Sequence, residues 1–314
     1  MKPGELRDRL GRYVALRRAV GFPMRAEERL LLDFVAFVES RGMDGAVRSA
    51  LALEWAQGSH CGPGAQNRRL SIVRGFLSHV RASVPEVDVP PVGILAGGRR
   101  PAPYIFTDDE IQAIVEETLL IGPAGSLRPH TQATMLGLLA ATGLRAGEVA
   151  RLRLDDVQLE TVPPHLRVIG TKFRKSRLVP VHPSTAAALR TYEARRARLG
   201  YDQVCEHFFV SERPGPASER SIRRTFGGLV RRLGIGVGAR RPPRLHDLRH
   251  TFAVRRMLAW YREGADVRAR LPELSVYLGH VNPGDTFWYL SAVPELLGIA
   301  GERFERFVSV GGAP

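Results

Sequence analysis

The stretch HDLRH, residues 246–250, carries three basic side chains within five positions. In a helix, positions i, i+3 and i+4 share one face, so residues 246, 249 and 250 lie together and His246 and Arg249 can point at the same phosphate. Guanidinium and imidazole N–H groups suit a phosphodiester and the charge that builds up on it during substitution. A helix start with solvated basic residues is the alternative. A zinc site is disfavoured because no cysteine or carboxylate lies nearby at ligand spacing.

Four other stretches offer groups for the same chemistry: TGLR at 142–145, KFRKSR at 172–177, LGH at 278–280 and TFWY at 286–289. Arg145 supplies a second guanidinium, and Glu148 could hold it through an i, i+3 pair. His280 follows a glycine, which allows a tight backbone turn. Each stretch alone is common in purely structural positions. It is their combination that indicates a site.

The same stretches contain a nucleophile and a proton donor. The Tyr289 hydroxyl can form a phosphotyrosine ester and so conserve the energy of a phosphodiester, although packing of this ring in the core is the alternative. The departing 5′-oxygen needs a proton, which lysine can supply and arginine in effect cannot. Only three of the 46 basic residues are lysine, and Lys172 and Lys175 are two of them. Two solvated lysines on a hairpin are an equally simple explanation.

Composition points to a polyanionic partner. The formal net charge is +14 and the pI is near 10.8, so nucleic acid is the first candidate and an anionic membrane surface the second. No apolar run approaches the roughly 20 residues needed to span a bilayer, and the N-terminus lacks the apolar stretch of a signal peptide. Cys61 and Cys205 suggest neither a metal site nor a disulfide framework. We expect a cytoplasmic protein without metal or cofactor.

Periodicity divides the chain into a helical bundle at 1–84, a linker rich in proline, glycine and arginine at 85–103, and a second domain at 104–314. In the bundle, Leu10, Tyr13, Leu16 and Val20 are spaced for one apolar face, and residues 64–80 form a helix with a second such face. The second domain begins with the capping-box pattern TDDE at 107–110. Its expected strands cover 153–158, 166–169 and 177–181, and its expected helices cover 131–141, 184–199, 218–233 and 246–260. The fold class is therefore mainly α with a small antiparallel sheet.

The order and spacing of six residues resemble the catalytic set of the tyrosine recombinase (phage integrase) family: Arg145, Lys172, His246, Arg249, His280 and Tyr289. The resemblance covers essentially the whole chain. It implies a SAM-like helical core-binding bundle, a linker and a C-terminal catalytic domain. The sequence YLS at 289–291 departs from the commoner ending of the family, and in this it resembles recombinases of transposons and related mobile elements.

The resemblance also implies a mechanism. Tyr289 would attack the scissile phosphate, which leaves a 3′-phosphotyrosyl link and a free 5′-hydroxyl. Three side chains would stabilise the transition state, namely Arg145, Arg249 and His280. Lys172 would protonate the leaving oxygen, and His246 would assist proton transfer from the tyrosine. A 5′-hydroxyl of the partner strand would then reverse the step, so that exchange needs neither ATP nor metal.

The implied partner is double-stranded DNA, bound by a homo- or hetero-tetramer on synapsed sites and associated with the bacterial nucleoid. Apolar residues recur at three- and four-residue steps behind the tyrosine, which predicts an amphipathic tail helix that packs on its own domain or on a neighbouring protomer. Two other functions fit part of the pattern. A type IB topoisomerase uses a similar set to relax DNA, and a non-catalytic DNA-binding accessory protein would need only the positive charge.

Overall fold

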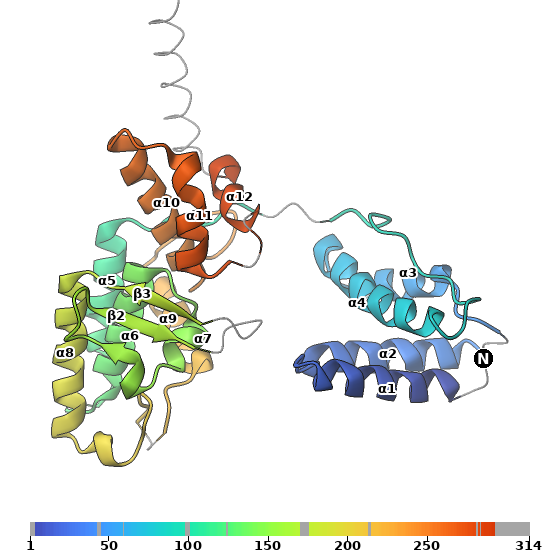
Figure 1. Cartoon of the computed structure of the whole chain (residues 1–314), viewed down its shortest axis with the longest axis horizontal. Coiled ribbons are helices and arrows are strands. Elements are labelled where there is room, and N and C mark those ends of the chain that lie inside the picture. Colours follow the sequence, from blue (N-terminus) through green and yellow to red (C-terminus); the bar gives the residue numbers. More distant parts are fainter. Residues whose placement is uncertain are drawn as a thin grey trace, which may run out of the picture. The chain divides into compact units, whose positions relative to one another are not determined.

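The computed structural model describes residues 4–42, 45–58, 60–97, 101–123, 125–169, 176–212, 215–280, 282 and 284–292. The chain divides into two compact units, Met1–Pro101 and Ala102–Pro314, with a division point inside the expected 85–103 linker (Figure 1). Lys172, Lys175 and the expected tail helix beyond residue 292 lie outside the described residues. No helix in the described part of the chain is long and apolar enough to cross a membrane.

Among its described residues the first unit has four helices, α1 (Glu5–Ala19), α2 (Arg25–Ser40), α3 (Ser49–Gln57) and α4 (Pro63–Arg81). The apolar face expected at 64–80 is confirmed, because the five apolar residues on it are buried: Leu70, Val73, Phe76, Leu77 and Val80. They pack against α2 residues such as Phe34 and against Trp55 of α3. Burial of this face holds the helices together.

The expected face of α1 is wrong in part. Leu10 is buried, but Leu16 is 50% exposed and Val20 is 61% exposed. The buried stripe runs instead through Leu6, Leu10 and Val14, which follow each other at four-residue steps. At about 100° per residue, Leu16 lies roughly 120° around the helix from Leu10 and so leaves the stripe.

Two arginines of α4 are occupied within the first unit. The guanidinium of Arg69 lies 3.8 Å from the ring centroid of Trp55 and pairs with Asp33. Arg74 donates to the carbonyls of Pro90 and Pro91 at 2.9 and 3.2 Å, and so fixes the start of the linker against the bundle. These two side chains therefore have structural partners, which overall charge alone did not reveal.

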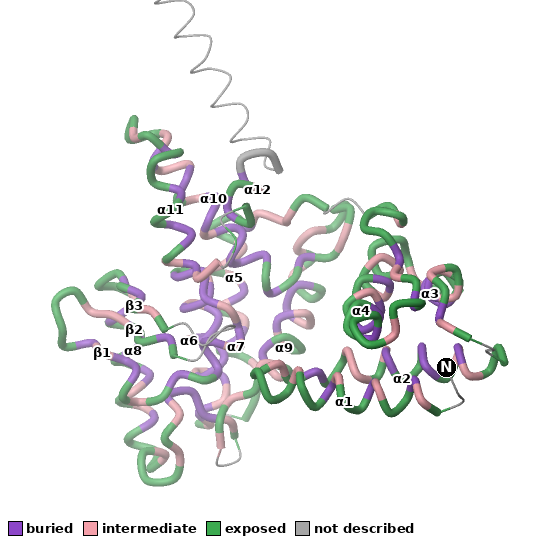
Figure 2. Tube along the Cα trace, turned by 45° about the vertical axis from the view of Figure 1, so that its right-hand side comes forward, coloured by how far each residue is buried: buried purple, intermediate pink, exposed green. Residues whose placement is uncertain are grey.

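The second unit places helices around a small sheet. The helices are α5 (Asp108–Leu119), α6 (Arg128–Thr142), α7 (Ala146–Ala150), α8 (Pro183–Arg198), α9 (Glu219–Arg232), α10 (Asp247–Arg262), α11 (Val267–Leu278) and α12 (Gly284–Ala292). The capping box at the start of α5 is confirmed, since Thr107 Oγ1 accepts from the Glu110 N–H and the Glu110 carboxylate accepts from the Thr107 N–H. Figure 2 shows α6 as a largely buried helix of this unit.

The sheet is antiparallel in the order β1 (Val157–Gln158), β2 (His165–Val168) and β3 (Arg177–Pro180). Leu166 pairs with Val157 on one side and with Val179 on the other, and it is fully buried. The first strand is shorter than expected because Leu154–Asp156 forms a 3₁₀ turn, closed by the Asp156 carboxylate on the Arg153 N–H.

Helix α11 was not expected from the sequence. It contains Pro272, a residue that normally disfavours a helix interior. Asp266 caps its first turn by accepting from the Ala269 N–H, and Leu271, Leu274 and Leu278 bury its apolar side. This helix ends immediately before His280, so it positions part of the site.

Candidate active site

Arg145 lies in the turn between two helices. Helix α6 ends at Gly143, whose φ of 64° is a conformation that glycine adopts at low cost. Helix α7 begins at Ala146, and the expected pair with Glu148 is confirmed, with Arg145 Nη1 2.8 Å from Glu148 Oε1. The Arg145 N–H donates to the other carboxylate oxygen at 3.0 Å. Glu148 thus fixes both the backbone N–H and the guanidinium of Arg145.

Glu148 is shared with a second arginine that the sequence analysis did not single out. Arg177, the first residue of β3, donates from both terminal nitrogens to the Glu148 carboxylate, at 3.2 and 2.9 Å. Burial opposes ionisation of this carboxyl, but the hydrogen bonds from Arg177 and from the Arg145 N–H outweigh it and hold the pKa of Glu148 below its usual value. Glu148 is therefore an anion between two guanidiniums.

Arg249 is almost fully buried on α10 and is held by backbone carbonyls. Its Nη1 donates to Gly143 O and its Nη2 donates to Leu278 O, both at 2.8 Å. Burial and next the guanidinium of Arg145 lower the pKa of Arg249 to about 10, so the side chain stays cationic at pH 7. The Gly143 turn that carries Arg145 thus also fixes Arg249.

His280 follows α11 in a left-handed turn at Gly279, with φ 70°. The His280 N–H donates to Ser275 O at 2.9 Å, and the Nδ1 of the ring lies 2.6 Å from Thr286 Oγ1. Helix α12 begins at Gly284, and the buried Thr286 lies inside it and contacts His280.

Tyr289 lies on α12 and is 1% exposed. Its hydroxyl is 2.7 Å from Nδ1 of His250, the residue after Arg249. The His250 ring in turn lies 4.8 Å from the ring of His246 in an edge-on contact. His250 was named in the HDLRH stretch but was not given a role. Its position one residue from an expected phosphate ligand was the available signal.

His246 directly precedes α10, and part of the residue is exposed to solvent. Desolvation by the surrounding protein, and next the guanidinium of Arg249, lower the pKa of its imidazole to about 4. Water at the exposed edge screens part of this effect, and we conclude that the ring is neutral at pH 7. The negative charge of a bound anion would oppose the repulsion by Arg249 and favour the protonated form of the ring.

The structure therefore brings together five of the six expected residues and the expected partner Glu148, and it adds Arg177 and His250. Lys172 lies outside the described residues. The guanidiniums of Arg145 and Arg177 bind one buried carboxylate, and the guanidinium of Arg249 is held by carbonyls. This leaves an excess of positive charge beside a tyrosine hydroxyl and three imidazoles. Such a site is suited to binding a phosphate group and stabilising additional negative charge on it.

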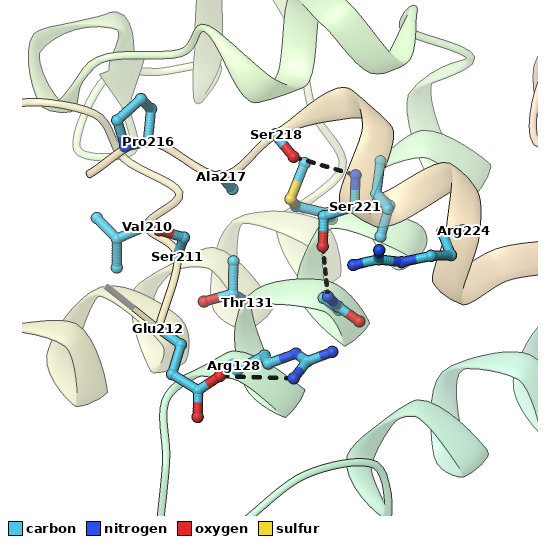
Figure 3. Close-up of a pocket in the computed structure, with 13 residues that line it drawn as sticks. Arg128, Thr131, Val210, Ser211, Glu212, Pro216, Ala217, Ser218, Ser221 and Arg224 are labelled. Carbon is cyan, nitrogen blue, oxygen red and sulfur yellow. Dashed lines mark hydrogen bonds and ion pairs between the residues drawn. The ribbon is translucent and has the colours of Figure 1, made fainter. Parts of the chain in front are cut away.

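A cavity of about 540 Å³ elsewhere in the second unit contains none of these residues. It lies between the N-terminal ends of α6 and α9 and residues 210–212 and 216–217 (Figure 3). Its charged groups are partly neutralised, because Arg128 pairs with Glu212 at 3.5 Å. We do not assign this cavity to the chemistry of the site.

Comparisons with known proteins agree with this chemistry. The profile of the phage integrase family matches residues 105–295. A protein of Sinorhizobium fredii (strain NBRC 101917 / NGR234) whose name describes an integrase/recombinase, y4rB, is 39% identical over 94% of this chain and 95% of its own. The integrase of transposon Tn1549, solved with transposon right-end DNA, shares the fold with a TM-score of 0.69 at 14% identity, over 96% and 98% of the two chains. A lambda integrase tetramer bound to a Holliday junction gives a TM-score of 0.60 at 16% identity, over 90% and 76%.

Proposed function

The chain belongs to the phage integrase family and is a site-specific tyrosine recombinase that acts on DNA, and from that premise we propose that Tyr289 is the residue that becomes linked to the DNA. Attack by its hydroxyl on the scissile phosphorus forms a 3′-phosphotyrosyl ester and releases a 5′-hydroxyl. Attack by a 5′-hydroxyl of the partner strand reverses the step and completes the exchange.

One observation carries this proposal: the guanidiniums of Arg145 and Arg249 are fixed on adjacent carbonyls, Gly279 O and Leu278 O. A phosphate held between them lies at the turn that carries His280. The two arginines and His280 then donate to the non-bridging oxygens, where charge develops in the transition state. The side chain of Arg145 is 35% exposed, so a ligand can reach it.

Proton transfers require two further groups in this proposal. Lys172 protonates the leaving 5′-oxygen, and His246 assists removal of the tyrosine proton, with His250 as the imidazole that already contacts the hydroxyl. Tyr289 is buried in the described arrangement, so α12 must shift before its hydroxyl can meet a phosphate. We propose that binding of DNA drives this shift.

The active assembly in this proposal is a tetramer on two synapsed duplexes. Support comes from the shared fold of the lambda integrase tetramer on a Holliday junction and from the net charge of +14. The ending YLS at 289–291 supports a role in a mobile element.

Covalent trapping tests the proposal. Wild type and Tyr289→Phe are incubated in EDTA with nicked duplexes taken from the DNA that flanks the gene, and the products are run on denaturing gels. We expect a protein–DNA adduct with wild type and none with Tyr289→Phe, while both proteins bind the duplex. An adduct of equal yield in the variant would remove Tyr289 from the reaction. Relaxation of plasmid without exchange between two sites would favour the topoisomerase alternative.

A further inference from the structure

Three arginines from three different elements bind three successive backbone carbonyls at the end of α11. Arg177 Nε donates to Tyr277 O, Arg249 Nη2 donates to Leu278 O, and Arg145 Nη2 donates to Gly279 O, each at 2.8 Å. The last carbonyls of a helix have no partners within the helix and carry its partial negative charge. The guanidiniums satisfy them, and they do so directly before His280.

Arg177 differs from the other two arginines because all three of its nitrogens are engaged. Nε binds Tyr277 O, and both terminal nitrogens bind Glu148. Its side chain is 10% exposed, against 35% for Arg145. Arg249 is also buried, but within the described residues its hydrogen bonds to the protein come from its two terminal nitrogens and not from Nε. A guanidinium whose three nitrogens are all hydrogen-bonded to the protein has few N–H groups left to bind a phosphate. Binding of the transition state therefore does not account for the position of Arg177.

Gly279 fits under the same guanidinium. A Cβ at this position would lie 2.6 Å from Nη1 and 2.8 Å from Cζ of Arg177. The glycine therefore serves two purposes, because its φ of 70° forms the turn and its missing side chain admits Arg177. Arg177 is packed against the backbone that leads into His280, and through Glu148 it is tied to Arg145.

We propose that Arg177 is a positioning residue that holds Arg145 and the turn carrying His280 in register with each other. It acts through Glu148 on one side and through Tyr277 O on the other, without touching the substrate. This inference rests on the proposed function for its catalytic consequence, but its structural consequence for His280 is independent of catalysis.

Two variants of Arg177, two matched control variants and one variant that assigns the NMR signals test the proposal. Arg177→Lys keeps one positive charge but cannot bind the carboxylate and the carbonyl with a planar fork, and Arg177→Met removes the charge. Arg190→Lys and Arg190→Met are the controls, because Arg190 also binds a carboxylate and a carbonyl, those of Glu160 and Leu159, yet contacts none of the site residues named above. His280→Asn identifies the His280 signals.

The first readout is the NMR titration of the imidazoles in the full-length protein without DNA. We expect both Arg177 variants to displace or broaden the His280 signals and both Arg190 variants to leave them unchanged. Because Arg177→Lys is the milder change, it keeps the test available if Arg177→Met fails to fold. His280 signals that are unchanged in a folded Arg177 variant overturn the proposal, whether or not cleavage can be detected.

The second readout is the single-turnover rate of adduct formation. Misplacement of reacting groups by about 1 Å costs on the order of 100-fold in rate. We therefore expect Arg177→Lys to lose between roughly 10- and 100-fold in this rate while duplex affinity stays near wild type.

A substrate with sulfur as the 5′ bridging atom needs no proton on its leaving group. It therefore separates a loss that acts through the leaving-group acid, Lys172, from a loss that acts through Arg145 and His280. The loss should persist with this substrate. Rescue by sulfur would mean that Arg177 acts through the leaving-group acid instead, and would overturn the role assigned to His280. Absence of an adduct with wild type would contradict the proposed function and leave the NMR result to decide on Arg177.

Discussion

Replacement of Glu148 by glutamine removes the anion between Arg145 and Arg177 while keeping the shape of the side chain. The carboxylate accepts from the Arg145 N–H and Nη1 and from both terminal nitrogens of Arg177, and only 2% of it is exposed. Loss of one partner of a buried ion pair costs about 3–5 kcal/mol. Solvent at the partly exposed Arg145 weakens its share of the interaction. We therefore expect a loss of about 3 kcal/mol in the free energy of unfolding of the second unit.

For a unit of this size, 1 kcal/mol shifts the melting temperature by about 2–4 °C, so Glu148→Gln should melt about 6–12 °C below wild type. The measurement is calorimetric or denaturant unfolding of the full chain. Glu160→Gln is the control, because Glu160 also pairs with an arginine, Arg190, but is 88% exposed. Its change should stay within about 1 kcal/mol.

The dependence on pH provides the sharper check. The folded-state pKa of Glu148 lies below its ordinary value of 4.5, so its contribution to stability is present above that value and is lost as the pH falls through the folded pKa. The difference in the free energy of unfolding between wild type and Glu148→Gln should be constant from pH 7 to about pH 5.5. It should then shrink as the wild-type carboxyl gains its proton. The reasoning would be refuted if Glu148→Gln loses no more free energy of unfolding than Glu160→Gln does. It would also be refuted if the loss stays undiminished at the lowest pH where both proteins fold.

Three other perturbations have expected outcomes. Gly279→Ala places a methyl against Arg177 at a φ of 70° and should cost at least about 1–2 kcal/mol in thermal unfolding, whereas Gly137→Ala, inside α6 with open space around it, should be neutral or stabilising. A neutral imidazole at pH 7 that meets a phosphate should gain a proton, so binding of duplex near pH 6 should take up protons, and calorimetry in two buffers should show this uptake for wild type and less of it for His246→Asn. Deletion of residues 298–314 should impair synapsis in gel-shift assays while single-site binding is kept, and unchanged synapsis would count against a tail that docks on a neighbour.

Local signals in the sequence predicted what depends on neighbours along the chain. The capping box at 107–110, the apolar face of α4 and the pair Arg145–Glu148 all join residues within a few positions, and the structure confirms each of them. The predicted face of α1 was wrong because the apolar residues of this segment permit two helical stripes, one of them through Leu6 and Val14, and contact with the rest of the bundle decides between them.

Contacts between distant segments could not be predicted in this way. Arg177 is 100 residues from Tyr277, and His250 is 39 residues from Tyr289. Composition and spacing give no information on which of 43 arginines is buried, and Arg177 stood in the sequence only as the end of a lysine motif. The three-dimensional fold alone reveals that this arginine reaches α11.

The same contacts explain how the site remains positive. Arginines are usually fixed by carboxylates, but each carboxylate cancels one charge and would weaken the attraction for a phosphate. Here Arg249 is fixed by two carbonyls, and Arg145 by one carbonyl and a share of Glu148. Carbonyls at a helix end supply partial negative charge in fixed positions without adding a full anion. Three guanidiniums are thereby oriented with a single carboxylate, and the charge that remains is available to a phosphodiester and to its more highly charged transition state.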